Sequence, residues 1–493
     1  MTVAQAAGKS GALEKYEAVI GIEIHCQLKT ASKMFCGCST DIDGAAPNSH
    51  CCPVCLGLPG VLPTINRTAV ELVIATGSAI GATTPAATRW DRKNYFYPDL
   101  PKGYQISQYQ LPLAANGRLT FDTSDGPFTV RINRAHLEED TGRLIHQDLD
   151  GRRVSLIDFN RSGMPLMEIV TEPDIRTAEQ ARRYAEELRL LMRTIGASDA
   201  EMENGQMRVE ANVSIRPIGR EAFGTRVEVK NMNSMRAVER AIAFEIERQA
   251  VAIDAGESIH METRGWDEGG QSTYHMRPKE AENDYRYFPE PDLPPLLTTP
   301  EWLAEIKARL PELPATRRTR YREAYGLSAY DAGVLVNDAA ATALFEGALA
   351  AGTGVPAKLL ANWVTGEYMR LAKWEGSSGS ADPAELAALV KLVADGAVSG
   401  TNAKEVFAEH FASGVKVAAI VETRGFRQIS DAGALGAAID TVLAANPAAV
   451  ADYRSGTTAA VGFLVGQVMK ATRGQANAAM VQTALRERLD KAD

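Results

Sequence analysis

Hydrophobic and polar residues alternate with a period of two in several short segments of the first 290 residues. The clearest are VIGIEIHCQL, FTVRINRAHL, RVSLIDFN, MRVEANVSIRP and TRVEVKN, and Gly, Pro, Asn and Asp residues separate them. Because successive side chains of a strand point to opposite faces, this pattern predicts an antiparallel sheet with one buried and one polar face. Residues 207–217 and 225–231 are expected to pair as a hairpin.

Two segments with helical periodicity interrupt these strands. One helix is expected after Thr177, where Gln180 completes a capping box, and it should end at Gly196. The second is expected after Ser234, with Met235 and every third or fourth residue beyond it on an apolar face. This first part of the chain should therefore combine strands and helices.

The pattern changes near residue 290, where four prolines fall within the run PEPDLPP. Beyond it, Thr299 and Pro300 form a helix start, and Ala/Leu-rich amphipathic stretches follow. We predict an α+β fold: a β-rich domain with an antiparallel sheet at 16–294, an all-α domain at 295–420 and a small all-α tail at 421–493.

Composition narrows the class of protein. The 493 residues carry a formal charge of −9, which argues against coating nucleic acid through bulk charge. No apolar run is long enough to span a bilayer, so no membrane partner is expected. Residues 1–15 have neither the apolar core of a signal peptide nor the arginines of a transit peptide. We therefore expect a disordered start to a cytoplasmic protein.

All six cysteines lie within the first 55 residues. FCGC and CPVC each offer two thiolates, and two such pairs are the usual way to build a tetrahedral zinc site. The expected ligands are Cys36, Cys38, Cys52 and Cys55, with Cys51 as an alternative to Cys52. Four protein ligands leave no open position, so the zinc would be structural. The competing interpretation is a loop with reduced thiols.

Acidic residues cluster at two further places. Glu23 and His25 share one face of the predicted strand VIGIEIHCQL, where they could hold a metal ion or form a surface ion pair. Glu138 and Glu139 are adjacent carboxylates that repel each other unless a cation or an exposed turn relieves them. The polar face of the predicted hairpin carries Glu210, as part of a solvated surface or of a polar pocket.

The segment DRKNYFYPDLPKGYQISQY crowds cations, amides and aromatic rings into one loop. Such side chains suit contacts with phosphates and bases, although aromatic residues in a Pro/Gly loop also serve to pack it. The chain has neither a P-loop nor a G-x-G-x-x-G motif, so those phosphate sites are not supported.

Several segments together resemble one family, the B subunits of the tRNA-dependent Asp/Glu amidotransferases. The matching segments are VIGIEIHCQLKT, CPVCLGLPGVLPTIN, DRKNYFYPDLPKGYQISQY, HLEEDTGR, PLMEIVTEPDIR, ANVSIRP, EVKNMNS, DYRYFPEPDLPP and GFLVGQVMKATRGQAN. The resemblance implies a ligase that converts Glu-tRNA(Gln) to Gln-tRNA(Gln), Asp-tRNA(Asn) to Asn-tRNA(Asn), or both. In this family the carboxylate is phosphorylated with ATP and then amidated with ammonia. A partner amidase (A) subunit supplies that ammonia from glutamine, and a small C subunit clasps the pair.

The resemblance also implies site residues. It places the catalytic residues at Glu23, His25, Glu139 and Glu203, and the Mg²⁺ or Mn²⁺ ligands at Glu23, His25, Glu138, Glu139 and Glu210. Candidates for contacting ATP or the acyl end of the tRNA are Lys93, Asn94, Lys230, Asn231 and Asn233. The family run EEGSLRCDAN reads ENGQMRVEAN here, with Asn204 at the second Glu and Glu210 at the Asp position.

The resemblance implies a catalytic cradle, a helical domain and a tail that contacts tRNA. From Arg454 onward the chain has six basic residues against three acidic ones, and Lys470 and Arg473 are the expected tRNA contacts. The alternative is a zinc-stabilised RNA-binding module without its own chemistry. A pure RNA binder gives no reason for the acidic clusters, which favour catalysis.

Overall fold

The computed structural model describes residues 14–278, 282–352, 354–373, 379–427, 432–472, 476 and 478–491. The predicted disordered start at residues 1–15 therefore lies outside the described residues, except for residues 14 and 15. Arg473 also lies outside the described residues. The chain divides into two compact units, one ending at Leu313 and the other beginning at Pro314. The combination of a large sheet with many helices confirms the predicted α+β class.

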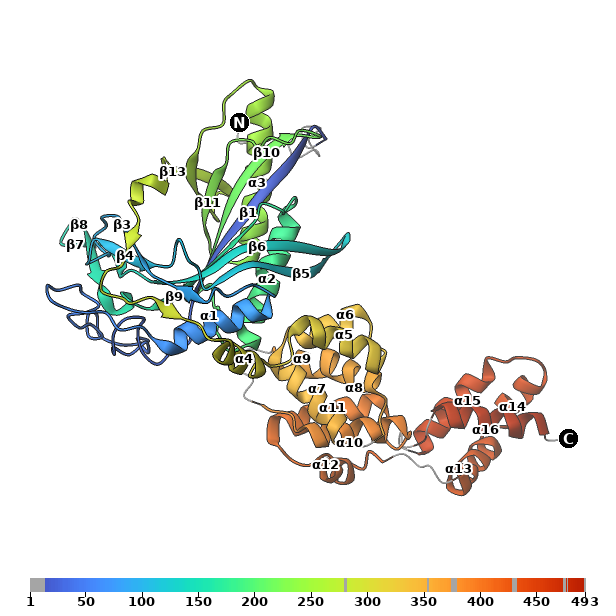
Figure 1. Ribbon diagram of the computed structural model, residues 1–493. Coiled ribbons are helices and arrows are strands. Elements are labelled where there is room, and N and C mark those ends of the chain that lie inside the picture. The colour runs from blue at the N-terminus through green and yellow to red at the C-terminus, as the bar shows by residue number, and fades with distance from the viewer. Residues whose placement is uncertain are drawn as a thin grey trace. The chain divides into compact units, whose positions relative to one another are not determined.

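The first unit is built around a large mixed sheet (Figure 1). Its order is β13-β12-β11-β10-β1-β9-β6-β4-β3-β14, with β5 paired to β6, and every pair is antiparallel except β11–β12. The strands are β1 (Tyr16–Gln27), β2 (Ala87–Thr88), β3 (Asp91–Asn94), β4 (Tyr104–Ser107), β5 (Ala114–Thr123), β6 (Gly126–Glu139), β7 (Arg143–Leu149), β8 (Arg152–Asp158), β9 (Pro165–Thr171), β10 (Met207–Pro217), β11 (Val227–Met232), β12 (Glu262–Asp267), β13 (Ser272–Pro278), β14 (Phe288–Pro289) and β15 (Leu296–Leu297).

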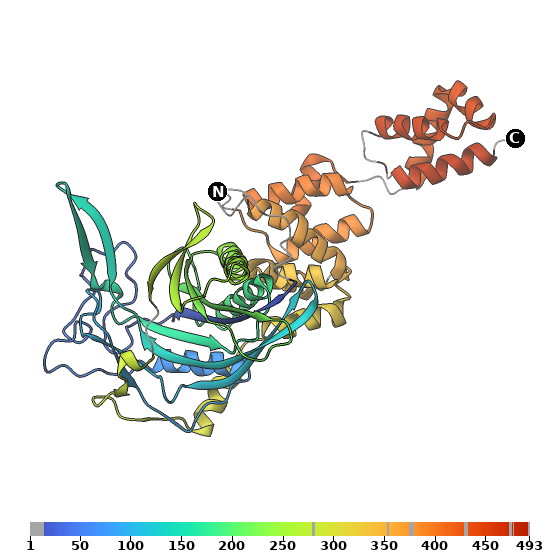
Figure 2. The same cartoon turned by 90° about the horizontal axis from the view of Figure 1, so that it is seen from above.

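Helices cover one face of this sheet. α1 (Arg67–Ala79), α2 (Ala178–Thr194) and α3 (Met235–Asp254) bury apolar side chains against Ile20, Ile22 and Ile24 of β1 and their neighbours (Figures 1 and 2). The predicted helix starts are confirmed, since Thr177 and Ser234 accept hydrogen bonds from the N–H groups of Gln180 and Ala237. The hairpin β10–β11 is also confirmed. The opposite face of the sheet carries charged side chains.

Strand β6 changes phase along its length. Val130 and Ile132 face the core, and so do Ala135 and Leu137, because the register against β9 shifts by one residue between Ile132 and Arg134. The irregularity turns His136 and Glu138 onto the charged face. A further hairpin, β7–β8, projects away from the large sheet (Figure 2).

The first unit runs past the predicted boundary at residue 294. α4 (Pro300–Ala308) packs on α1, and both Trp302 and Arg309 donate hydrogen bonds to Glu71. Pro300 occupies the first turn after the N-cap Thr299, as expected.

The described elements of the second unit are helices, apart from an isolated bridge between Val398 and Arg427. Its helices are α5 (Pro314–Tyr325), α6 (Ala329–Val336), α7 (Ala339–Ala350), α8 (Ala357–Trp363), α9 (Met369–Ala372), α10 (Pro383–Ala394), α11 (Gly400–Ser413), α12 (Val417–Arg424), α13 (Ala432–Ala445), α14 (Pro447–Arg454), α15 (Ala460–Ala471) and α16 (Ala478–Lys491). An apolar core between Leu435 and Leu489 joins the last four. The predicted division at residue 420 stays a prediction, and α12 runs across that point. No helix in the described ranges has the length and apolar character needed to cross a membrane.

Candidate active site

Four neighbouring strands bring titratable side chains together on the charged face of the sheet. β1 pairs with β10 on one side and β9 on the other, and β9 pairs with β6. In this register His25 lies opposite Glu168, His136 also lies opposite Glu168, and Glu23 lies opposite Glu210. Because directly opposed side chains are neighbours, residues distant in sequence form one polar surface.

The first group on this surface consists of His25, Glu138 and Glu168, whose ligand atoms lie within 4.8 Å of one another. His25 Nε2 is 3.6 Å from Glu138 Oε1 and 3.5 Å from Glu168 Oε2. His136 Nε2 approaches the same Glu168 oxygen at 3.4 Å. Glu138 Oε2 and His25 Nδ1 are buried without hydrogen-bond partners. Since unpaired buried polar atoms are costly, this group is suited to an additional ligand.

The charges of the first group are strongly coupled. Burial, together with the negative charge of Glu168, raises the pKa of Glu138. Burial alone would raise the pKa of Glu168 too, but the charge and hydrogen bond of His136 and those of His25 lower it well below its usual value. Burial opposes protonation of His25, yet Glu168 and Glu138 raise its pKa to about 9. A divalent cation would relieve the repulsion between the two carboxylates.

Lys93 of β3 adds a fixed positive charge beside this group. Burial lowers its pKa, but the carboxylate of Glu138, then Tyr287 and Glu168, raise it well above the usual value. Its Nζ lies 4.8 Å from the centre of the Tyr285 ring, within the range of a cation–π contact. Asn94, predicted to contact ATP or the acyl end, instead donates hydrogen bonds to the Tyr285 and Arg286 carbonyls. It therefore fastens the segment that covers Lys93.

A second group consists of Glu23, Glu210 and Glu228, with ligand atoms again within 4.8 Å of one another. Lys230 forms an ion pair with Glu210 and lies 3.6 Å from Glu228. Burial raises the pKa of Glu210, but the positive charge of Lys230 brings it below the usual value. Asn212 donates a 2.7 Å hydrogen bond to Glu23. Lys230 thus supplies positive charge to this group.

Glu139, predicted to share the metal site, lies apart from it because adjacent residues of a strand point to opposite faces. Its carboxylate forms a buried ion pair with Lys102 and accepts a 3.0 Å hydrogen bond from the Ile106 N–H. Both charged residues line a cavity of about 190 Å³ that also includes Cys55 and Gly163. Glu139 therefore serves a different pocket from that of Glu138.

Glu203, also predicted as catalytic, is exposed in the turn that precedes β10. Among the described residues it belongs to neither carboxylate group. Asn231, near the end of β11, and Asn233, just after that strand, are both exposed, and the amide of Asn231 donates to the Tyr274 hydroxyl at 3.2 Å. The structure adds Glu168 and Glu228, which were not among the predicted site residues. A signal existed for Glu168, since it is the only charged residue in the apolar run PLMEIV.

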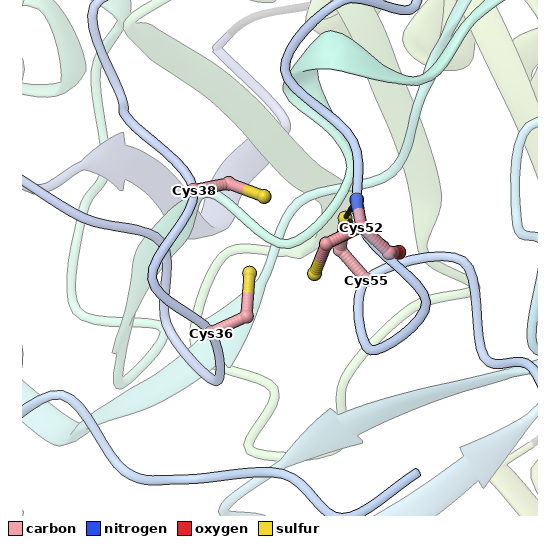
Figure 3. A group of neighbouring side chains, drawn as sticks. All are labelled: Cys36, Cys38, Cys52 and Cys55. Atoms are coloured by element: carbon pink, nitrogen blue, oxygen red, sulfur yellow. Dashed lines mark hydrogen bonds between the residues drawn. The ribbon is translucent and has the colours of Figure 1, made fainter.

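Four cysteines form a third group, separate from the two carboxylate groups (Figure 3). Cys36 and Cys38 come from one loop and Cys52 and Cys55 from another, with their Sγ atoms within 4.8 Å of one another. Cys51 is outside this group, with its Sγ 3.9 Å from Asn160 Oδ1. This arrangement suits a tetrahedral thiolate site and selects Cys52 over Cys51.

The cysteine cluster favours thiolate at one position in particular. A hydrogen bond from Cys36 lowers the pKa of Cys55 to about 4, against the opposing effect of burial, and the Cys52 N–H and Lys33 contribute. Burial raises the pKa of Cys38 to about 11. A metal ion would hold all four as thiolates, since it replaces their protons.

Comparisons with known proteins agree with this picture. Residues 18–304 match the family model described as the GatB/GatE catalytic domain, and residues 343–489 match the GatB domain. Proteins named as the B subunit of aspartyl/glutamyl-tRNA(Asn/Gln) amidotransferase are similar over nearly the whole chain. The one from Moorella thermoacetica is 50% identical over 96% of this chain and 100% of its own length. The one from Picosynechococcus is 49% identical over 96% and 98%, respectively.

The charged sheet face thus lies in a catalytic domain of the GatB/GatE type. The chain as a whole belongs to the family of aspartyl/glutamyl-tRNA(Asn/Gln) amidotransferase B subunits. Membership confirms the predicted class, a ligase component of a tRNA-dependent amidotransferase, and implies ATP use and partner subunits.

Proposed function

We propose that this chain activates and amidates the side-chain carboxylate of Glu-tRNA(Gln), Asp-tRNA(Asn) or both. The observation that carries the proposal is the buried group of His25, Glu138 and Glu168 beside Lys93. A carboxylate becomes a good electrophile only when one oxygen leaves as phosphate, and that transfer requires positive charge around the phosphates. The charged face offers both a site for a cation and a lysine.

His25, Glu138 and Glu168 would hold the cation. Their one nitrogen and two carboxylates suit Mn²⁺ directly, whereas Mg²⁺ prefers oxygen and would contact His25 through water. When bound, such a cation neutralises phosphate charge and polarises the phosphoryl oxygens. His136 would hold Glu168 in place through the 3.4 Å contact.

The remaining charged residues would position the substrates. Lys93 would face anionic oxygens of ATP or the acyl group. Lys230 would contact the same kind of oxygens from beside the second carboxylate group, where Glu23 and Glu210 would orient the lysine. Asn231 and Asn233 stay candidates for ATP or acyl contacts, since they are exposed beside Lys230 in the chain. Asn94 would act indirectly by holding the segment over Lys93.

The other parts of the chain would serve assembly and tRNA binding. We infer a cradle, a helical domain and a tail, with Lys470 exposed on α15 as a tRNA contact. Ammonia would come from a partner amidase, with a small third protein clasping the pair. The complex would work in the cytoplasm, where charged tRNA is used.

The purified complex of the three proteins tests the reaction. With Glu-tRNA(Gln) or Asp-tRNA(Asn), ATP and glutamine, it should form the amidated aminoacyl-tRNA together with ADP, phosphate and glutamate. Each tRNA is assayed separately, since the cell's synthetases determine which is mischarged. A complex that binds these tRNAs but forms neither product would favour an RNA-binding module.

We also propose that the cysteine cluster holds a structural zinc ion. Replacing Cys52 and Cys55 with serine should abolish zinc binding and lower the melting temperature of the complex, whereas Cys51→Ser should keep both. Metal analysis and thermal unfolding provide the measurements. An unchanged melting temperature in a zinc-free double variant would exclude the structural role.

A further inference from the structure

Lys33 is a completely buried lysine next to the cysteine cluster. It has no exposed surface, and its Nζ donates to the His50 carbonyl at 2.8 Å and to the Phe159 carbonyl at 3.4 Å. Its third contact is Cys55 Sγ at 3.7 Å. Within the described chain, no aspartate or glutamate forms an ion pair with it.

A buried ammonium without a counter-charge is strongly destabilising. Two carbonyl groups satisfy its hydrogen bonds but leave its charge uncompensated. The remaining partner is a sulfur atom of a four-cysteine group, and four thiolates around a doubly charged zinc ion carry a net charge of −2. Lys33 and this group are therefore complementary in charge.

The backbone around Lys33 strengthens the connection. Its N–H donates to the Cys38 carbonyl at 3.0 Å, while the side chain reaches Cys55, so one residue spans both cysteine pairs. Gly163, with a φ of +83°, packs beside both residues, since a Cβ there would be in ordinary van der Waals contact with Cys55 Cβ at 3.4 Å and with Lys33 Cδ at 3.6 Å. The lysine is held in one position rather than free to turn to solvent.

We propose that Lys33 is a positioning residue of the zinc site, whose ammonium donates to the Cys55 thiolate and offsets the charge of the thiolate group. The inference rests on the proposed zinc ion. A hydrogen bond from a cation makes a thiolate less nucleophilic, and the charge strengthens retention of the metal site. Cys55 should therefore be protected more than Cys38, whose sulfur Lys33 does not contact.

The test compares Lys33→Met, Lys33→Arg and the matched control Lys29→Met in the purified three-protein complex. Lys29 is an exposed lysine of the same segment, paired with Asp199. Zinc content is measured first, then zinc transfer to a chromogenic chelator, and then alkylation of each cysteine by iodoacetamide with mass spectrometry.

We expect Lys33→Met to release zinc about tenfold faster and to raise alkylation of Cys55 about tenfold relative to Cys38. Lys33→Arg should stay within about threefold of the wild type because it keeps the charge. Lys29→Met should change nothing.

The proposal is overturned if Lys33→Met leaves both rates unchanged. Equal gains at Cys38 and Cys55 also overturn it, since they indicate a lysine that merely anchors the two carbonyls. If Lys33→Met does not fold, the test uses Lys33→Gln, whose amide can still donate hydrogen bonds without carrying a charge. Unchanged rates of zinc release and Cys55 alkylation in Lys33→Gln would likewise overturn the proposal. A folded wild type without zinc would instead refute the zinc site itself.

Discussion

Replacing Glu168 with glutamine tests the central feature of the site, the sharing of a cation between two buried carboxylates. The substitution keeps the size and one oxygen but removes one negative charge. Glu168 Oε2 lies 3.5 Å from His25 Nε2. We take this distance as the separation between the Glu168 carboxylate and a positive charge held in the group. At that separation and an effective dielectric constant of 20, two unit charges attract by about 5 kcal/mol.

The same change removes the repulsion between Glu168 and Glu138, whose ligand atoms lie within 4.8 Å. That repulsion acts both with and without the bound cation, so it does not offset the lost attraction between the cation and Glu168. Since 1.4 kcal/mol is tenfold in affinity, we expect divalent binding to weaken at least tenfold. Amide formation should then require correspondingly more Mg²⁺.

Mn²⁺ binding to the complex, followed by electron paramagnetic resonance, measures the affinity directly. A Mg²⁺ titration of amide formation from the mischarged tRNA measures its consequence. The comparison variant is Glu203→Gln, since Glu203 is exposed outside both carboxylate groups and should behave as the wild type. Normal Mn²⁺ affinity in Glu168→Gln, or a loss in Glu203→Gln instead, would refute the assignment drawn from the geometry.

Further predictions concern charge at other positions. Lys93→Met should lower the rate of amide formation about a hundredfold in single-turnover assays, while filter binding shows an unchanged affinity for tRNA. The control Lys29→Met should leave both unchanged, and equal losses in the two variants would exclude a specific role for Lys93. The hydrogen bond from Arg131 holds the pKa of Asp174 below its usual value. The ionised Asp174 therefore stabilises the folded protein at pH values above its unfolded-state pKa, and this contribution is lost as the pH falls through the lower pKa of the folded state. Asp174→Asn should thus destabilise the protein by at most about 1 kcal/mol at pH 7, and the difference from wild type should shrink as the pH falls and the Asp174 carboxylate is protonated. A difference in urea unfolding that stays constant with pH would contradict this. Lys470→Ala should weaken tRNA binding and lower its salt dependence by about one ion, whereas an unchanged salt slope would remove Lys470 from the interface.

Local features of the fold could be predicted from the sequence because they depend on neighbouring residues. The helix cap at Thr177 and the alternation of β10 need only a few adjacent side chains, and both are confirmed. The sheet order could not be predicted in this way. β1 lies between β9 and β10, and pairings over such distances depend on the whole core.

Part of the candidate site was similarly beyond local reasoning. Simple alternation would place His136 and Glu138 on the same face as Val130 and Ile132. The register shift before Arg134 reverses this phase, and period counting cannot locate such an irregularity. The family resemblance implied Glu23, His25, Glu138, Glu139 and Glu210 as ligands, but only the strand register shows Glu168 opposite His25.

The end of β6 connects the two halves of the site through strand geometry. Glu138 points to the cation group, while Glu139 points to the cavity lined by Lys102 and Cys55. Because one short backbone segment carries both side chains, we expect a shift of the cysteine loop that moves Glu139 to move Glu138 as well. The zinc ion proposed for the cysteines would therefore contribute to the cation site indirectly, by fixing the strand end rather than by contacting substrate. On this argument, a zinc-depleted complex that remains folded should bind Mn²⁺ more weakly, although none of the four cysteines belongs to the cation group.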